Sequence, residues 1–483
     1  MRKHLARLRT HRTGGRFVAL LAGALLLATA QQTTAAPLPT APAASPAAAH
    51  RAAAPSWTGT WATTPTQTPA SDTTAFEDQT LRQIVRVSIG GDRVRIRLSN
   101  EFGDRPLVIG EARVARPAAG GPDSRIDPRT DRPLTFGGRA AVTIPAGAPL
   151  LSDPVDLRVP AGSDLVVSIH LPERTAGSTL HAFAQRQNYV ASGNVTRNTG
   201  IEATSTNDRW YFLSGVSVTT GRADSENRAD TTGRADSENR ADTTSRADTT
   251  GRAGGASRSS AVVTLGDSIT DGANTEPGAD HRWPDFLAQR LRTAYGPYAR
   301  GVLNEGISGN RLLHDPNPPA GSDAENFAAY FGQSALRRFD RDVAAQPGAG
   351  HLIVLLGVND LGHPGTVAPE SERVSAADLI DAHRQLIARA HERGLKAYGG
   401  TILPFKDDTL GFYSPANEAA RTTFNHWLRT SGEYDGVIDF DKALRDPSDP
   451  QRLLARYDSG DHLHPNDAGA EAMAEAVPLK FLR

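Results

Sequence analysis

Ala261-Val-Val-Thr-Leu265 runs directly into Gly266-Asp-Ser-Ile-Thr-Asp-Gly272, and these twelve residues give the clearest indication of the fold class. An unbroken apolar run that ends in turn-forming residues is typical of a strand buried on both faces of a parallel sheet. A serine on the tight turn after such a strand exposes its hydroxyl and its backbone N–H toward the same space. Ser268 is therefore a candidate nucleophile, although an ordinary helix N-cap is the alternative interpretation of the same residues.

Apolar strands and amphipathic helices alternate through the rest of the second half of the chain. Expected strands cover residues 301–305, 351–356, 396–403 and 437–440, and expected helices cover 283–295, 328–345, 376–393, 417–429 and 468–476. This alternation predicts a parallel sheet covered by helices on both faces. Ligands of such sheets bind at the carboxyl ends of the strands.

Three further motifs fall at such strand ends or near the C-terminus. Gly309, in Ile-Ser-Gly-Asn310, permits close backbone approach, and Asn359, in Gly-Val-Asn-Asp360, offers an amide N–H₂ donor. In Asp461-His-Leu-His464, a carboxylate three residues before an imidazole can hold one ring nitrogen while the other faces a nucleophile. A loop glycine, a helix cap and a surface histidine are the alternative interpretations of these residues taken singly.

The ordered set Gly-Asp-Ser-Ile, Ile-Ser-Gly-Asn, Gly-Val-Asn-Asp and Asp-His-Leu-His resembles the SGNH hydrolases, also called GDSL esterases and lipases. The resemblance implies a flavodoxin-like three-layer α/β/α domain that needs no cofactor. It implies Ser268 as nucleophile, His464 as base and Asp461 as the group that orients the base. Gly309 and Asn359, with the Ser268 amide, would be the oxyanion donors. Ile269 stands where the family name has leucine, which is an apolar exchange.

Other polar residues near these motifs receive lesser roles. Asp267, Asp271 and Asp360 are expected to be turn or supporting groups. His314, His363 and His462 could be offered as metal ligands, but no helical His-x-x-x-His pair or other compact ligand cluster accompanies them. The sequence therefore predicts no metal site.

The first folded region is predicted to be an all-β sandwich or jelly roll over residues 56–219. Val85, Val87 and Ile89 alternate with polar residues, and after a turn at residues 90–92 the alternation resumes over 94–98, which predicts a hairpin. The tryptophans of this region (Trp57, Trp61 and Trp210) could stack on sugars, but core packing is the preferred interpretation. Core packing is likewise preferred for Trp283, in the second half of the chain, over a place in a substrate wall. Such a sandwich before the catalytic region resembles a secreted subgroup related to xylan-associated arylesterases and acylhydrolases.

The remaining segments are predicted to be targeting and linking sequences. Basic residues precede an apolar run at 17–30, so residues 1–36 are interpreted as a signal peptide and the protein as secreted, with no membrane anchor after cleavage. Residues 37–55 form an Ala/Pro-rich disordered leader. Residues 220–258, which contain a direct repeat of GRADSENRADTT, form a disordered linker before a catalytic domain at 259–483.

Composition narrows the partners and the chemistry. The chain has 53 basic and 54 acidic residues, so no charge excess indicates nucleic-acid binding. Cysteine is absent, which removes thiol nucleophiles.

The leading hypothesis is an esterase that removes short acyl or acetyl groups from carbohydrate, such as an acylated polysaccharide, or from small esters. The alternatives are a lipase for longer-chain lipid esters and a binding protein with an inactive hydrolase domain.

Overall fold

The computed structural model describes residues 56–121, 124–219 and 260–483. Residues Ala54–Arg483 form one compact unit. The predicted signal peptide, leader and repeat linker lie outside the described residues, so these assignments and the domain boundaries stay predictions. Among the helices that are described, none is both long and apolar enough to cross a membrane.

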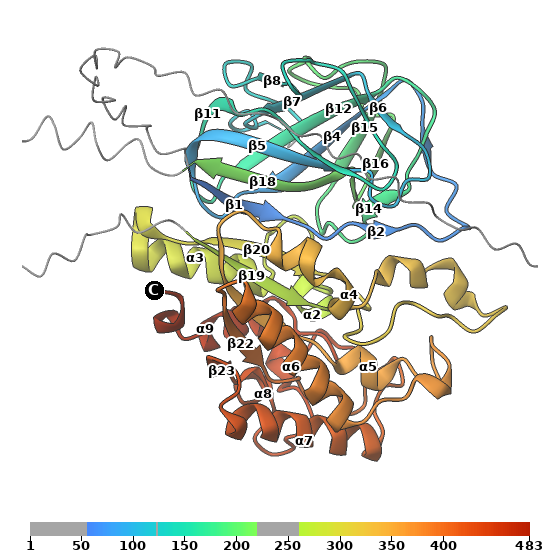
Figure 1. The fold of residues 1–483 in the computed structure, drawn as a ribbon, viewed down its shortest axis with the longest axis vertical. Coiled ribbons are helices and arrows are strands. Elements are labelled where there is room, and N and C mark those ends of the chain that lie inside the picture. The colour runs from blue at the N-terminus through green and yellow to red at the C-terminus, as the bar shows by residue number, and fades with distance from the viewer. Residues whose placement is uncertain (1–55, 122–123, 220–259) are drawn as a thin grey trace, which may run out of the picture. The chain divides into compact units, whose positions relative to one another are not determined.

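A five-stranded, all-parallel sheet forms the centre of the second region (Figure 1). Its spatial order is β20-β19-β21-β22-β23, which is the 2-1-3-4-5 order of flavodoxin-like folds. The strands are β19 (Ala261–Gly266), β20 (Gly301–Gly306), β21 (Ala349–Leu355), β22 (Lys396–Gly400) and β23 (Gly436–Ile438). The predicted α/β class is confirmed.

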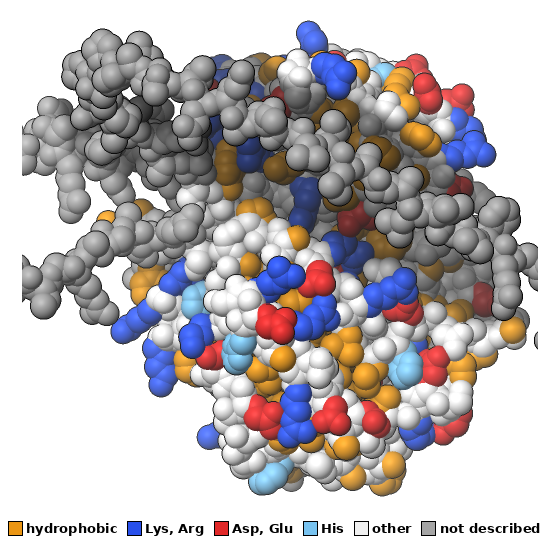
Figure 2. Space-filling view, in the orientation of Figure 1, with side chains coloured by type: hydrophobic (Ala, Val, Ile, Leu, Met, Phe, Trp, Pro, Cys, Tyr) orange, Lys and Arg blue, Asp and Glu red, His pale blue; other side chains and the backbone are white. Residues whose placement is uncertain are grey.

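Two groups of helices accompany this sheet. Helices α3 (Trp283–Tyr295), α8 (Phe440–Leu444) and α9 (Asp467–Ala476) pack together, and α4 (Ala335–Phe339), α6 (Ala376–Glu392) and α7 (Pro415–Ser431) form the other group. Short helices α2 (Ser268–Asp271) and α5 (Val358–Gly362) follow β19 and β21. Figure 2 shows acidic and basic side chains interspersed over the face on which α6 and α7 lie, as the near-zero net charge leads one to expect.

The single helix predicted over residues 328–345 is wrong. The segment begins as a 3₁₀ turn (Ala328–Phe331), breaks at Gly332, and resumes as α4 and a π-helical turn (Asp340–Ala344). Gly332 has φ of 65°, the left-handed region that favours glycine and ends a helix. The break leaves the carbonyl groups of Phe331 and Gln333 free to accept hydrogen bonds from Asn310.

The first region is built from antiparallel sheets, which confirms the predicted all-β class. One sheet has the order β1-β18-β5-β10 with β11 also on β5, and the other has the order β16-β15-β4-β12-β7-β8. Their strands are β1 (Trp57–Ala62), β4 (Gln79–Arg86), β5 (Gly91–Ser99), β7 (Glu111–Ala115), β8 (Arg132–Leu134), β10 (Pro149–Leu151), β11 (Val155–Val159), β12 (Asp164–Leu171), β15 (Asn188–Ser192), β16 (Ser205–Asn207) and β18 (Leu213–Thr219).

Short strands complete this region in three small sheets. They are β2 (Thr66–Gln67), β14 (Thr179–His181) and β17 (Trp210–Tyr211) in one sheet, β3 (Ala75–Phe76) with β13 (Thr175–Ala176), and β6 (Leu107–Ile109) with β9 (Val142–Ile144).

The hairpin predicted between residues 85–89 and 94–98 is wrong. Strand β4 pairs with β12 and β15, whereas β5 pairs with β18, β10 and β11, so the turn at Gly90 carries the chain from one sheet to the other. Val85 and Val94 are both fully buried. Alternation therefore located the strands and their buried faces, but it carried no information on which strands pair.

Three of the tryptophans considered at the sequence level belong to the core. Trp61 and Trp210 are 8% and 3% exposed, and their rings meet edge to face with centroids 5.0 Å apart. Trp283 is 1% exposed. Trp57 is half-buried beneath the Arg95 guanidinium. The core interpretation is confirmed for Trp61, Trp210 and Trp283.

The two regions meet along β20, which ends the parallel sheet. A Cβ added at Gly301 of β20 would lie 2.0 Å from the carbonyl oxygen of Gly59 in β1, so the two backbones touch at this point. The backbone N–H of Val302 donates to the Ser88 hydroxyl, at 2.9 Å. The edge strand of the parallel sheet is thus in contact with the first region.

Candidate active site

Ser268 begins α2 directly after β19, at the carboxyl edge of the parallel sheet. Asp267 caps this short helix, and its carboxylate accepts a hydrogen bond from the Ile269 N–H at 3.1 Å. Burial raises the pKa of Asp267 to about 7, against the opposing effect of that N–H. The serine itself is 6% exposed.

Ser268, His464 and Asp461 form a continuous hydrogen-bonded chain. The Ser268 Oγ lies 2.8 Å from His464 Nε2, and His464 Nδ1 lies 2.6 Å from Asp461 Oδ2. The imidazole thus joins the hydroxyl to the carboxylate through its two ring nitrogens. This is the arrangement in which a histidine can accept a serine proton while a carboxylate fixes its tautomer.

The turn that carries the histidine is organised around Asp461. Its Oδ1 accepts the N–H groups of Leu463 and His464, at 3.0 and 2.8 Å, and Asn274 Nδ2 donates to Oδ2 at 2.8 Å. Although burial alone would raise it, the His464 ring and the N–H groups of His464 and Leu463 hold the pKa of Asp461 well below its usual range. The carboxylate therefore stays ionised and oriented.

Gly309 lies in the loop after β20, and its φ of 78° is in the left-handed region that favours glycine. A Cβ at this position would lie 2.1 Å from the Phe331 ring, so that ring covers the glycine. The neighbouring Ser308 donates both its N–H (2.9 Å) and its hydroxyl (2.7 Å) to Asp271 Oδ2. The loop is thereby tied to Asp271, the last residue of α2.

Asn359 lies in α5, after β21, and is 3% exposed. Its Nδ2 donates one hydrogen to the Asn310 carbonyl at 3.0 Å. An amide nitrogen carries two hydrogens, so this bond orients the second one. The next residue, Asp360, accepts the N–H groups of Leu312 and Leu313 at 2.7 and 3.0 Å and so fixes the chain that follows the Gly309 loop.

Arg338 is a buried residue that no sequence motif selects. Its guanidinium donates to the carbonyl groups of Gly266 and Glu305, at the ends of β19 and β20, and to the side chain of Asn310. Asn310 in turn donates to the carbonyls of Phe331 and Gln333. No short motif marks Arg338, because its partners come from distant parts of the chain.

The histidines considered as metal ligands have other surroundings. His363 is buried, with its ring 5.2 Å from that of Phe331 and 5.5 Å from that of Phe412, and burial lowers its pKa to about 3. His462 contacts Asp458 at 2.5 Å. A separate group of acidic and imidazole side chains (Glu276, His281 and Asp467) lies close together, and His281 Nδ1 is 2.6 Å from Asp467 Oδ2.

A Ser–His–Asp chain at the carboxyl edge of a flavodoxin-like sheet is the arrangement of a serine hydrolase. Residues 264–472 match the model of the GDSL-like lipase/acylhydrolase family. By this match these residues form a GDSL-like lipase/acylhydrolase domain, and the class that the match supports is that of the carboxylic ester hydrolases. Among curated proteins, none matches this sequence.

Similar solved structures include a putative lipolytic protein of the G-D-S-L family from Desulfitobacterium hafniense, with 20% identity and a TM-score of 0.31. It covers 45% of this chain, and the chain covers 97% of it. A putative acylhydrolase from Bacteroides fragilis has 16% identity and a TM-score of 0.33, and the match covers 46% of this chain and 86% of the acylhydrolase. An acetylxylan esterase from Geobacillus stearothermophilus has 17% identity and a TM-score of 0.34, and the match covers 46% of this chain and 94% of the esterase.

Proposed function

We propose that Ser268 is the nucleophile of a secreted esterase that removes short acyl groups from carbohydrate or from small esters. The observation that carries the catalytic part is the pair of hydrogen bonds from His464, 2.8 Å to Ser268 Oγ and 2.6 Å to Asp461 Oδ2. The family of residues 264–472 supports ester hydrolysis.

In the proposed mechanism, His464 Nε2 takes the proton of Ser268 as its oxygen attacks the ester carbonyl carbon. The backbone N–H groups of Ser268 and Gly309 and the second N–H of Asn359 stabilise the oxyanion. His464 then gives the proton to the departing alcohol, which leaves an acyl-enzyme. Water, deprotonated by His464, releases the acid and restores Ser268. Asp461 stabilises the imidazolium without taking its proton.

The surroundings of Gly309 support a short acyl group. The Phe331 ring covers this glycine, and the His363 and Phe412 rings fill the space behind it. Both of these rings are 4% exposed, so the packing beside the proposed oxyanion donor leaves little room for a long chain. A lipase acting on longer-chain lipid esters is the second candidate, and the family of the domain includes such enzymes by its description.

Secretion is proposed from the N-terminal sequence alone, where basic residues precede the apolar run 17–30. N-terminal sequencing of protein recovered from the medium of an expressing culture tests it. A start close to residue 31 or 37 is expected, and retention of the full N-terminus inside the cells would refute secretion.

Labelling with a fluorophosphonate tests the nucleophile. Wild-type protein is expected to gain one adduct on the intact chain, and Ser268→Ala none, because the reagent reacts with an activated serine. An equal adduct on both proteins would refute the assignment.

Hydrolysis of aryl esters with acyl chains from acetyl to palmitoyl separates the two candidate functions. The highest kcat/KM is expected with acetyl or butyryl esters. A maximum at long chains would favour the lipase.

A further inference from the structure

The first region reaches the active-site loops through His181, in β14. The His181 Nε2 lies 3.0 Å from Asp271 Oδ1, and both side chains are 3% exposed. Asp271 ends α2, the helix that begins with Ser268, and its other oxygen accepts both hydrogens of Ser308. A side chain of the all-β region thus shares a buried carboxylate with the residue that precedes Gly309.

Both ring nitrogens of His181 have hydrogen-bond partners. Its Nδ1 lies 3.0 Å from the carbonyl oxygen of Thr64, which can only accept, so Nδ1 carries a hydrogen. Both oxygens of Asp271 are engaged, Oδ1 by the His181 ring and Oδ2 by Ser308. Neither the ring nor the carboxylate can rotate without breaking a buried hydrogen bond, and such a loss is costly.

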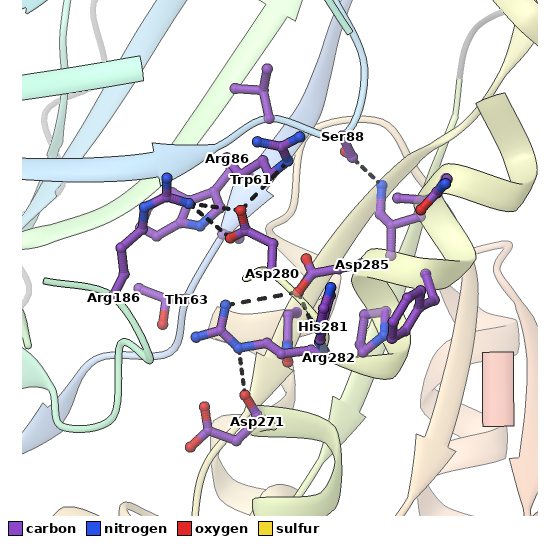
Figure 3. A pocket seen from close by; sticks show the side chains of 18 of the residues that line it. Trp61, Thr63, Arg86, Ser88, Arg186, Asp271, Asp280, His281, Arg282 and Asp285 are labelled. Carbon is purple, nitrogen blue, oxygen red and sulfur yellow. Dashed lines mark hydrogen bonds and ion pairs between the residues drawn. The ribbon is translucent and has the colours of Figure 1, made fainter. Parts of the chain in front are cut away.

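The main chain of Asp271 is held from the same side. Arg282 Nε donates to the Asp271 carbonyl at 2.6 Å, as Figure 3 shows, and the guanidinium also donates to the Ala184 carbonyl of the first region. The Trp210 ring lies 5.5 Å from the same guanidinium. Arg282 and Trp210 line a cavity of about 140 Å³ between the two regions, and His181 and Asp271 form part of its wall.

We infer that His181 is a positioning residue of the esterase: through Asp271 it sets the Ser308–Gly309 backbone at the distance from Ser268 that an oxyanion needs. The inference rests on the proposed function, because it assigns Gly309 to the oxyanion hole. Oxyanion donors are effective because they are already in position when the negative charge develops. If the Ser308–Gly309 loop loses the support of Asp271 and His181, the transition state is therefore stabilised less, while substrate binding changes little.

Two substitutions of His181 separate its two hydrogen bonds. In His181→Gln the amide nitrogen can take the place of Nε2 and still donate to Asp271. In His181→Asn the shorter amide reaches only the place of Nδ1, so the bond to Thr64 stays and the bond to Asp271 is lost. With p-nitrophenyl acetate, we expect kcat of the Gln variant within about threefold of wild type and that of the Asn variant at least about tenfold lower, with KM nearly unchanged in both.

His170→Asn is the matched control. His170 is also a buried histidine of the first region paired with an aspartate, at 3.0 Å from Asp78, and it lies on β12, which pairs with β4 and β7. The kcat of His170→Asn should stay within about twofold of wild type.

Binding of an alkylboronic acid, which forms a tetrahedral adduct with a serine, provides a second measurement. In His181→Asn the affinity for this compound should fall by the same factor as kcat/KM. If His181 had only a structural role, the fall in affinity would not match the fall in kcat/KM.

Asp271 offers a second pair of variants if His181→Asn does not fold. Asp271→Asn can accept from Ser308 and donate to a neutral His181, and should retain activity, whereas Asp271→Ala should lose at least tenfold. Equal kcat in His181→Asn and wild type, or in Asp271→Ala and wild type, would overturn the inference. An inactive wild-type protein would instead overturn the proposed function, and the inference with it.

Discussion

The two regions of the molecule contribute to the proposed site in different ways. The α/β region supplies the side chains of the hydrogen-bonded chain, Ser268, His464 and Asp461. The all-β region supplies none of these, but its His181 and Thr64 bond to buried carboxylates of the α/β region, Asp271 and Glu305. The proposed reacting groups and the groups that support them thus lie in different parts of one compact unit. Substitutions in the two parts should therefore lower kcat by different amounts.

The largest effect is expected from Asp461→Asn. An amide at this position cannot hold the His464 tautomer that accepts the Ser268 proton, and kcat should fall by roughly 10³–10⁴-fold with aryl acetates. His462→Asn is the matched control, because it breaks the neighbouring Asp458–His462 pair in the same turn and asparagine tolerates the φ of 63° found there. A fall of less than tenfold for Asp461→Asn would contradict the assignment.

The next effect is that of Asn359→Ala. Loss of one oxyanion donor should lower kcat by about 10²–10³-fold with little change in KM. Asn194→Ala removes a comparable amide, 3.0 Å from Glu111, in the all-β region and should leave kcat unaltered. If both variants kept full activity, Asn359 would have no part in stabilising the transition state.

A smaller effect is expected from Phe331→Ala. Removing the ring opens space beside Gly309, and the ratio of kcat/KM for octanoate to that for acetate should rise about tenfold, since each added methylene then finds contact. Phe183→Ala, which removes a ring of the all-β region that is 37% exposed, serves as the control. An unaltered chain-length profile in Phe331→Ala would remove this ring from the acyl site.

The smallest effect on activity, and a measurable one on stability, is expected from Glu305→Gln. Burial, aided by nearby Asp342, raises the pKa of Glu305 to about 8 from its ordinary 4.5. The folded protein thus holds this proton over a pH range in which the unfolded chain has released it. The free energy of unfolding therefore falls as pH rises from about 4.5 to 8, by an amount on the order of 5 kcal/mol.

Glutamine has no proton to lose, so this part of the pH dependence should vanish in Glu305→Gln. Urea unfolding at pH 5 and pH 8.5 measures it, and the variant should gain on wild type only at the higher pH. Glu372→Gln is a control, because the pKa of that carboxyl is lowered by its Asn317 and Arg311 bonds although its burial acts in the opposite sense. Parallel pH profiles of wild type and Glu305→Gln would contradict the prediction.

The sequence predicted the parts of the site that are local in the chain. The four motifs each end a strand or occupy one turn, so the class of the sheet brings Ser268 and its partners to one edge. Arg338, Phe331 and His181 were not predicted, because each acts through contacts between distant segments and stands in no motif. Asp271 was expected only as a turn or supporting group, since nothing in its own segment names His181 as its partner.

For the fold, too, local features were predicted and contacts between distant segments were not. Apolar alternation predicted the strands and the α/β order, but the hairpin at Gly90 was wrong because pairing depends on which sheet receives the next strand. The helix predicted over 328–345 was wrong because Gly332 breaks it, and the hydrogen bonds that the break permits come from Asn310 in another loop.

The contact between Ser88 and the backbone of Val302 has a consequence for handling the protein in pieces. Strand β20 ends its sheet, and an uncovered strand of this kind invites pairing with other chains. Residues 260–483 expressed alone would present that strand to solvent together with the Leu303 side chain that now meets Gly59. Self-association is therefore the expected fate of the isolated fragment, and the all-β region acts as its built-in safeguard against aggregation.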